Sequence, residues 1–344
     1  MRPGLGVVRT FRSAVSGGSA VSGRPEGLHY TTAMSAFGSG RRFGAIAGLV
    51  GLCVLLWALT PHFLTVSNAL NVMEQTSINA IVAVGMTFVI VSGGIDLSVG
   101  SLVAFSGVVL AAALKAGWPA PAAVGAALAV GAACGLANGL VIALGRLPPF
   151  IMTLGMMSVA RGAALMFTDG RPISGFDAPF RAIAVSRIAG VPAPILITLL
   201  IYGAAHLVLA RTRFGRYVYG IGGNEEATRL SGVAVHFHKT MIYVVSGVMS
   251  AVAAVLLTAR LNTAQPIAGI MYELDAIAAV VIGGTSLSGG EGTLGGTLIG
   301  ALTMGVLRNG LNLLGVSSFL QQLVIGLVIV VAVLVDTLLK EKKS

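Results

Sequence analysis

Residues 91–100 have the sequence Val-Ser-Gly-Gly-Ile-Asp-Leu-Ser-Val-Gly, which sets a carboxylate, two serines and three glycines inside an otherwise apolar region. A weaker copy, Gly-Gly-Thr-Ser-Leu-Ser-Gly-Gly, occupies residues 283–290. Breaking a membrane-spanning helix frees backbone groups that lipid cannot hydrogen-bond, so such breaks occur where protein or a water-filled path replaces lipid. Two matching breaks in one chain predict a duplicated membrane protein with a polar route through it.

The composition points to the same class of protein. The chain is 56% hydrophobic and 10% charged, with a mean hydropathy of +0.92, whereas a soluble domain carries about 25% charged residues. A net charge of +10 would suggest nucleic-acid binding in a soluble protein. Here the basic residues lie at the chain ends and in one loop, so membrane topology explains them better. Cys53 and Cys134 lie in apolar runs without disulfide or metal spacing.

The chain divides into a long apolar domain and two short tails. Residues 1–42 carry six arginines and one glutamate among many glycines and serines, which predicts a disordered cytoplasmic tail. A sharper hypothesis is that translation starts at Met34. Residues 43–338 form the predicted transmembrane domain, with a cytoplasmic loop at 211–239, and residues 339–344 form a second cytoplasmic tail.

The domain contains about ten runs near the length of about 20 apolar residues that a bilayer demands. We expect spans at residues 43–60, 75–92, 97–114, 119–144, 150–168, 193–210, 240–259, 274–290, 293–313 and 318–336, and a half-crossing at about 261–275.

Orientation follows from the lysines and arginines. Both ends of the domain and the 211–239 loop are basic. The positive-inside rule therefore predicts that both termini and this loop are cytoplasmic, which requires an even number of spans.

An internal repeat is also visible. Asn138-Gly139-Leu140 corresponds to Asn309-Gly310-Leu311 at an offset of about 170 residues, whereas the two glycine-rich breaks are offset by 190. The halves are therefore not simple copies, and the pattern leaves open whether they are inverted or parallel.

The polar residues of the breaks and of the repeat are the candidates for a substrate pathway. Three roles remain open for Asp96: a cap for the helix that follows, a substrate contact, or a proton relay. The predicted pathway residues are Ser92, Gly93, Gly94, Asp96, Ser98, Asn138, Gly283, Gly284, Ser286, Ser288 and Asn309.

Other charged residues in or near the spans are less informative. We expect Glu74, Glu273, Asp275 and Glu291 at membrane interfaces. Arg161 and Arg308 could reach an interface or pair with an acid that the sequence does not identify.

The 211–239 loop contains a short capped helix. Asn224 can cap its start, Glu225 and Glu226 suit its first turn, and Gly232 can end it. Such a short helix is unstable alone, so it docks either on its own protein or on a partner. The predicted helix comprises Asn224, Glu225, Glu226, Ala227, Thr228, Arg229, Leu230, Ser231 and Gly232.

The chain has no Gly-x-x-x-x-Gly-Lys-Ser/Thr motif and no nucleophile–base constellation or metal cluster. We therefore predict that it is not an enzyme. If it moves a solute uphill, the energy comes from a partner or from an ion gradient.

Three long motifs resemble the permeases of ribose-type ABC importers. Residues 85–100, 212–224 and 273–285 carry the resemblance in the expected order, and it extends over roughly residues 43–338. The implied fold is an all-α integral membrane protein of the type II ABC importer kind. The implied location is the bacterial inner membrane.

The resemblance also implies partners and a mechanism. Two permease copies, identical or related, would assemble with ABC ATPase subunits that hold ATP and Mg²⁺, while the permease itself carries no cofactor. A periplasmic binding protein would deliver a monosaccharide. Residues 224–232 would be the coupling helix that docks on the ATPase and drives alternating access.

Two alternatives remain at this stage. One is an ABC permease for nucleosides or branched-chain amino acids on the same scaffold. The other is an ion-coupled secondary transporter that uses Asp96 as its coupling site.

Overall fold

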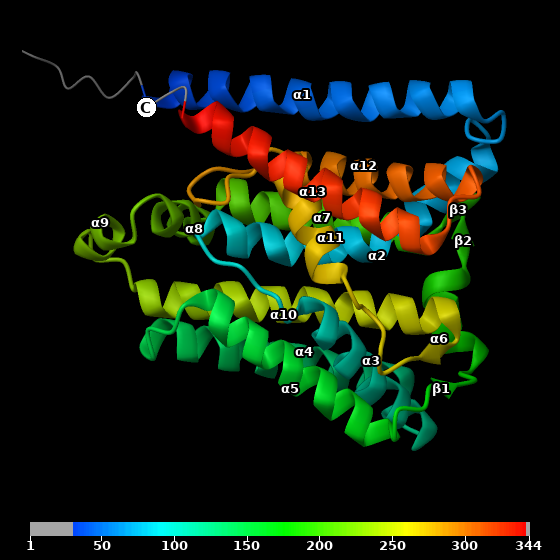
Figure 1. Ribbon diagram of the computed structural model, residues 1–344. Helices are drawn as coiled ribbons and strands as arrows, with labels where there is room; N and C mark the ends of the chain where they lie inside the picture. Colours follow the sequence, from blue (N-terminus) through cyan, green and yellow to red (C-terminus); the bar gives the residue numbers. More distant parts are fainter. Residues whose placement is uncertain (1–29, 342–344) are drawn as a thin grey trace, which may run out of the picture. The chain divides into compact units, whose positions relative to one another are not determined.

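The computed structural model describes residues 30–341, and side chains within residues 44–334. Within that part the chain is helical, with four two-residue strands (Figure 1). The helices are α1 (Tyr30–Leu59), α2 (Val66–Val91), α3 (Val99–Lys115), α4 (Ala120–Leu144), α5 (Pro149–Thr168), α6 (Ala178–Val185), α7 (Ala193–Arg211), α8 (Arg213–Gly223), α9 (Glu225–Leu230), α10 (Val235–Leu261), α11 (Tyr272–Ile282), α12 (Leu294–Leu313) and α13 (Ser318–Glu341). The strands are β1 (Ile173–Ser174), β2 (Arg187–Ile188), β3 (Val191–Pro192) and β4 (Thr263–Ala264).

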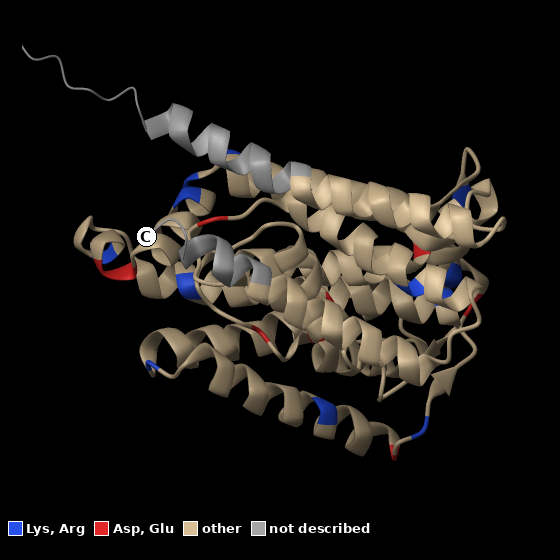
Figure 2. Ribbon diagram, turned by 45° about the horizontal axis from the view of Figure 1, so that its top comes forward, with Lys and Arg blue, Asp and Glu red and all other residues tan. Residues whose placement is uncertain are grey.

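Five of the described helices, α2, α4, α5, α7 and α10, are long and apolar enough to cross a membrane. Shorter apolar segments occur at Gly44–Leu59, Val99–Lys115 and Ser318–Leu334. Most charged residues lie toward the ends of the long helices, with mainly uncharged ribbon between them (Figure 2). The predicted class, a helical membrane protein, is thus supported by helix length and composition.

Several predicted boundaries are wrong, because helices continue through polar residues that a hydropathy reading excludes. Helix α2 begins at Val66 rather than at 75, after the Thr65 side chain accepts a hydrogen bond from the backbone N–H of Asn68 at 3.2 Å. Helix α10 begins at Val235 rather than at 240, and α8 occupies part of the predicted 211–239 loop in addition to the short helix expected there. Residues 169–192, which lie between two expected spans, likewise contain α6.

The predicted half-crossing at 261–275 is also wrong. A turn and strand β4 separate α10 from α11, and α11 begins only at Tyr272. The positive φ angles of Asn262 (54°) and Met271 (71°) interrupt the helical path. Helix α11 ends at Ile282, so the second half of the predicted 274–290 span is not helical.

The predicted tail boundaries shift as well. Helix α1 begins at Tyr30 and therefore includes residues 30–42 of the predicted tail. The last proline before it is Pro25, so nothing prevents the helix of residues 43–59 from extending backwards. At the other end α13 continues to Glu341, inside the predicted 339–344 tail. The remaining tail residues lie outside the described ones, and the Met34 start stays a prediction.

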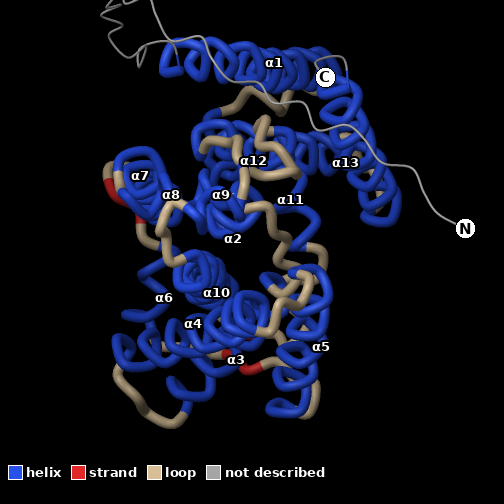
Figure 3. Tube along the Cα trace, turned by 90° about the vertical axis from the view of Figure 1, so that its left-hand side faces the viewer, coloured by secondary structure: helices blue, strands red, loops and turns tan. Residues whose placement is uncertain are grey.

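Small residues bring α4 and α10 into close contact (Figure 3). Gly131, Gly135 and Gly139 recur every fourth residue on one face of α4, and a Cβ atom on any of them would overlap or crowd the α10 backbone. Hydrophobicity cannot drive helices together in lipid, so such close backbone packing contributes to their association.

Helix α2 forms the most buried element on the other side of α10. All its residues from Ala80 to Val91 are buried, and α7, α10, α11 and α12 surround it. The first glycine break follows at the end of this central helix.

Candidate functional site

The two glycine breaks meet in space. The backbone N–H of Gly290, in the second break, donates to the carbonyl oxygen of Val91 at 2.8 Å. A Cβ atom on Gly289 would lie 2.9 Å from the nitrogen of Gly93, in the first break. The ends of α2 and α11 and the segments that follow them therefore form one junction.

Helix α8 ends against this junction. A Cβ atom on Gly222 would overlap the carbonyl oxygen of Val91 and lie 2.6 Å from the nitrogen of Gly290. The Tyr219 hydroxyl donates to the carbonyl oxygen of Gly292 at 2.7 Å. Any movement of α8 would therefore displace the backbone of both breaks.

Asp96 is fully buried in a hydrogen-bond cluster at the first break. Its Oδ1 accepts from the Ser98 backbone N–H at 2.9 Å and from the Ser98 hydroxyl at 2.6 Å, and its Oδ2 accepts from the Ser246 hydroxyl of α10 at 2.7 Å. The Asn138 amide of α4 donates to the Ser98 hydroxyl at 3.0 Å. The cluster thus joins the break to α4 and α10.

Asp96 is not itself the N-cap of α3, because that position is Ser98 and no side chain caps the helix. The carboxylate accepts a backbone N–H at the entrance to α3, and the side chain has no exposed surface. Asp96 and Asn138 line neither of the two cavities described below. A pathway role for either residue stays a prediction.

The other predicted pathway residues of the breaks form local turns. The Ser92 hydroxyl donates to the carbonyl oxygen of Val89 at 2.8 Å, and the Ser286 hydroxyl accepts from the backbone N–H of Ser288 at 3.2 Å. Gly283 packs against the backbone of Gly296 in α12. Gly284 has a φ of 86°, a conformation that favours glycine.

Asn309 lies elsewhere. Its amide donates to the Asn68 side chain at 2.9 Å, and the Asn68 amide donates back at 3.0 Å. This reciprocal pair joins α12 to the first turn of α2. Asn138 and Asn309, which the repeat matches, therefore have different surroundings.

The predicted short helix is present as α9. The Asn224 side chain accepts from the Ala227 backbone N–H at 2.8 Å, Glu225 and Glu226 lie in the first turn, and Gly232 has a φ of 84°. None of its residues is buried, and Leu230 keeps 75% of its surface exposed.

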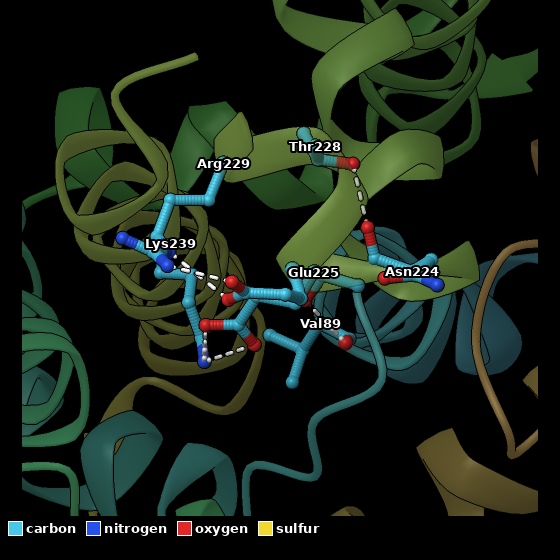
Figure 4. Close-up of polar contacts among 8 residues, drawn as sticks. Val89, Asn224, Glu225, Thr228, Arg229 and Lys239 are labelled. Carbon is cyan, nitrogen blue, oxygen red and sulfur yellow. Dashed lines mark hydrogen bonds and ion pairs between the residues drawn. The ribbon is translucent and has the colours of Figure 1, made fainter. Parts of the chain in front are cut away.

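Exposed ion pairs form at the first turn of α9 (Figure 4). Lys239, near the start of α10, contacts the Glu225 carboxylate at 2.9 Å. Arg229 contacts Glu226 at 2.6 Å, and this hydrogen bond lowers the pKa of the Glu226 carboxyl. The helix therefore docks on its own protein along one side, while the rest of its surface remains open.

A cavity of about 280 Å³ lies between α2, α10, α11 and α12. Asp275, which is 4% exposed, projects into its wall and accepts from Arg308 Nη2 at 3.0 and 2.9 Å. The Asn79 amide donates to the same carboxylate at 3.1 Å. Asp275 is buried among helices, and it is the partner that the sequence did not identify for Arg308.

A second cavity, of about 130 Å³, lies beside the first and shares Leu257, Leu261 and Tyr272 with it. The segment between β4 and α11 forms part of its wall. Arg161 of α5 holds this segment by donating to the carbonyl oxygens of Pro266 at 2.8 Å and Ala268 at 2.7 Å. Arg161 thus bonds to backbone within the protein.

The family model described as branched-chain amino acid transport system / permease component matches residues 68–333. The chain belongs to this permease family. The permease is 50% identical over 296 residues to the ribose import permease protein RbsC of Escherichia coli K12, covering 85% of this chain and 92% of that protein. It is 48% identical to the ribose import permease protein of Bacillus subtilis, covering 86% of this chain and 92% of the relative.

The chain also resembles a permease that is named for another sugar, xylose. The xylose transport system permease protein XylH of Escherichia coli K12 is 34% identical, with 87% of this chain and 92% of that protein covered. No solved structure matches the permease significantly. The resemblance to ribose-type permeases is therefore confirmed.

The polar lining of the larger cavity was not predicted from the sequence. Gln75, Thr76 and Asn79 line it from α2, and their spacing puts them on one face of a helix. The predicted span at 75–92 begins within this polar stripe, so these three residues were assigned to the end of a helix. The stripe was the signal that could have revealed the site.

Proposed function

We propose that this permease is the membrane subunit of an ATP-driven importer that takes up a monosaccharide by alternating access. The observation that carries the proposal is the 50% identity, over 85% of the chain, to a ribose import permease. Ribose is therefore the first substrate to test. The permease provides the path, and ATP hydrolysis takes place on a partner.

The proposed topology has ten spans: α1, α2, α3, α4, α5, α7, α10, α11, α12 and α13. Counting from a cytoplasmic N-terminus, both glycine breaks and the α8–α9 segment fall on the cytoplasmic side. The contacts among Val91, Gly222 and Gly290 fit this placement. Strands β1 and β4 then both fall outside, in agreement with their antiparallel pairing.

The proposed partners follow from the same arrangement. An ABC ATPase that holds ATP and Mg²⁺ docks on exposed α9, and a periplasmic sugar-binding protein delivers substrate to the opposite side. A second permease copy completes the membrane core. Motion of the ATPase passes from α9 through α8 to the junction of the two breaks.

One alternative retains support. The family description names branched-chain amino acids, and the larger cavity contains opposite charges on Asp275 and Arg308. A zwitterionic amino acid could use such charges. They already engage each other at 2.9 Å, however, and the named relatives above transport sugars.

Uptake measurements separate these functions. In whole cells carrying the complete transporter, labelled ribose should accumulate and labelled leucine should not. ATP depletion should stop accumulation, whereas an uncoupler that spares ATP should not. Leucine uptake would favour the alternative, and uptake that survives ATP depletion but not the uncoupler would overturn the ATP-driven mechanism.

A further inference from the structure

We infer that the 280 Å³ cavity between α2, α10, α11 and α12 is where the monosaccharide rests during transfer, with Thr76 and Asn79 contacting its hydroxyl groups. This inference rests on the proposed function and assigns it a site.

Two buried polar atoms in the cavity wall lack a protein partner. They are the Thr76 hydroxyl oxygen and the Asn79 side-chain oxygen. Thr76 is only 6% exposed. Threonine and serine in a helix commonly bond to the preceding turn, as Ser77 and Thr87 do on the same helix at 2.8 and 2.7 Å. Buried polar groups are rarely left unpaired, so a ligand in the cavity is the expected hydrogen-bond partner of these two atoms.

The neighbouring contacts orient the asparagine. Its amide nitrogen donates to Asp275 at 3.1 Å, which leaves its oxygen to accept a hydrogen bond. A sugar hydroxyl both donates and accepts. It can therefore donate to Asn79 and exchange a hydrogen bond with Thr76, while Arg308, whose side chain is 39% exposed, can donate to another sugar oxygen.

The charges in the wall favour a neutral ligand. Arg308 pairs with Asp275 at 2.9 Å, and Arg260 pairs with Glu74 at 3.2 Å. Both arginines line the cavity. An ionic ligand would have to displace one of these pairs, whereas a polyhydroxyl compound can bond beside them.

The cavity size agrees with a small ligand. Pockets for drug-sized molecules are about 300–1,000 Å³, and this cavity, at about 280 Å³, falls just below that range. Gly305 lets α12 approach Thr76 closely, because a Cβ atom there would overlap the Thr76 hydroxyl.

The test uses the complete transporter in liposomes, with ribose uptake and ATP hydrolysis measured on the same preparation. Thr76→Val removes the hydroxyl without breaking any hydrogen bond that the protein makes. Uptake should fall about tenfold, the effect of one lost ligand hydrogen bond, while ATPase stimulation by the loaded binding protein changes less than about twofold. Thr76→Ser should restore most of the uptake, and Gly305→Ala should lower it as Thr76→Val does.

A matched control is available on α12. Thr303 bonds to the carbonyl oxygen of Ile299 at 2.8 Å and does not line the cavity, so Thr303→Val should leave the amount of ribose moved per ATP unchanged. If the wild type takes up ribose and both Thr76→Val and Gly305→Ala transport it normally, the proposed sugar site is wrong, although the proposed function stands. Parallel loss of uptake and ATPase stimulation in both variants would also overturn it, by assigning the residues to assembly. No ribose uptake by the wild type would instead refute the proposed function.

Discussion

Gly290 donates its backbone N–H to the carbonyl oxygen of Val91 at 2.8 Å, although the two residues belong to different glycine breaks. Gly222, at the end of α8, packs against the same carbonyl oxygen. The exposed α9 follows α8 directly along the chain. This junction therefore connects the helix proposed to dock the ATPase with both interrupted helices.

The junction leads to a prediction about Gly222→Ala. The added methyl group overlaps the Val91 carbonyl, and such overpacking costs about 1–3 kcal/mol. We expect a lower midpoint of thermal unfolding and less ribose moved per ATP. Gly223→Ala is the control, because a Cβ atom there has no other atom within 4 Å. If both variants behaved alike, the tight contact at Gly222 would have no mechanical role.

The Asp96 cluster predicts a graded loss of stability. Asp96→Ala removes the acceptor for the Ser98 N–H and the Ser246 hydroxyl, and losing hydrogen bonds to a charged group costs about 3 kcal/mol. Asp96→Asn keeps one acceptor oxygen, so it should cost about 1 kcal/mol. Chemical or thermal unfolding of the purified permease measures both changes. Normal stability of both variants together with abolished uptake would instead indicate a direct role in transport.

The Asp275–Arg308 pair predicts non-additive stability effects. Asp275→Ala leaves Arg308 and the Asn79 amide without their carboxylate. Breaking a fully buried pair costs about 3–5 kcal/mol. Because Arg308 is 39% exposed, solvent screening reduces this to about 2 kcal/mol. The double variant Asp275→Ala/Arg308→Ala should be more stable than the sum of the single effects by about 1 kcal/mol. Strict additivity in this double-mutant cycle would contradict the pair.

Local signals in the sequence predicted much of this arrangement. The cap, first turn and terminal glycine of α9 are all encoded within residues 224–232, so the helix could be identified before its surroundings were known. The two glycine breaks were also visible, because polar residues stand out in apolar surroundings. Their direct contact could not be predicted, since it joins segments about 190 residues apart.

The larger cavity escaped prediction for a related reason. Asp275, Arg308 and Asn79 come from three helices, and only tertiary packing brings them together. The path of residues 262–271 was mistaken for half a span, because hydropathy does not register left-handed backbone at Asn262 and Met271. Asn309 was grouped with Asn138 by sequence similarity, although the two residues bond to different helices.

The most direct test of the central claim is co-purification of a P-loop ATPase with the permease. The wild type is compared with the triple variant Glu225→Ala/Glu226→Ala/Arg229→Ala, whose side chains lie on exposed α9. Since none of these residues is buried, the triple variant should fold normally, with Thr303→Val as a control for the preparation. We predict recovery of the ATPase, and its stimulation by a sugar-loaded binding protein, with the wild type and their loss with the triple variant. Equal recovery with both would contradict coupling through α9, and no ATPase with either would contradict the ATP-driven importer.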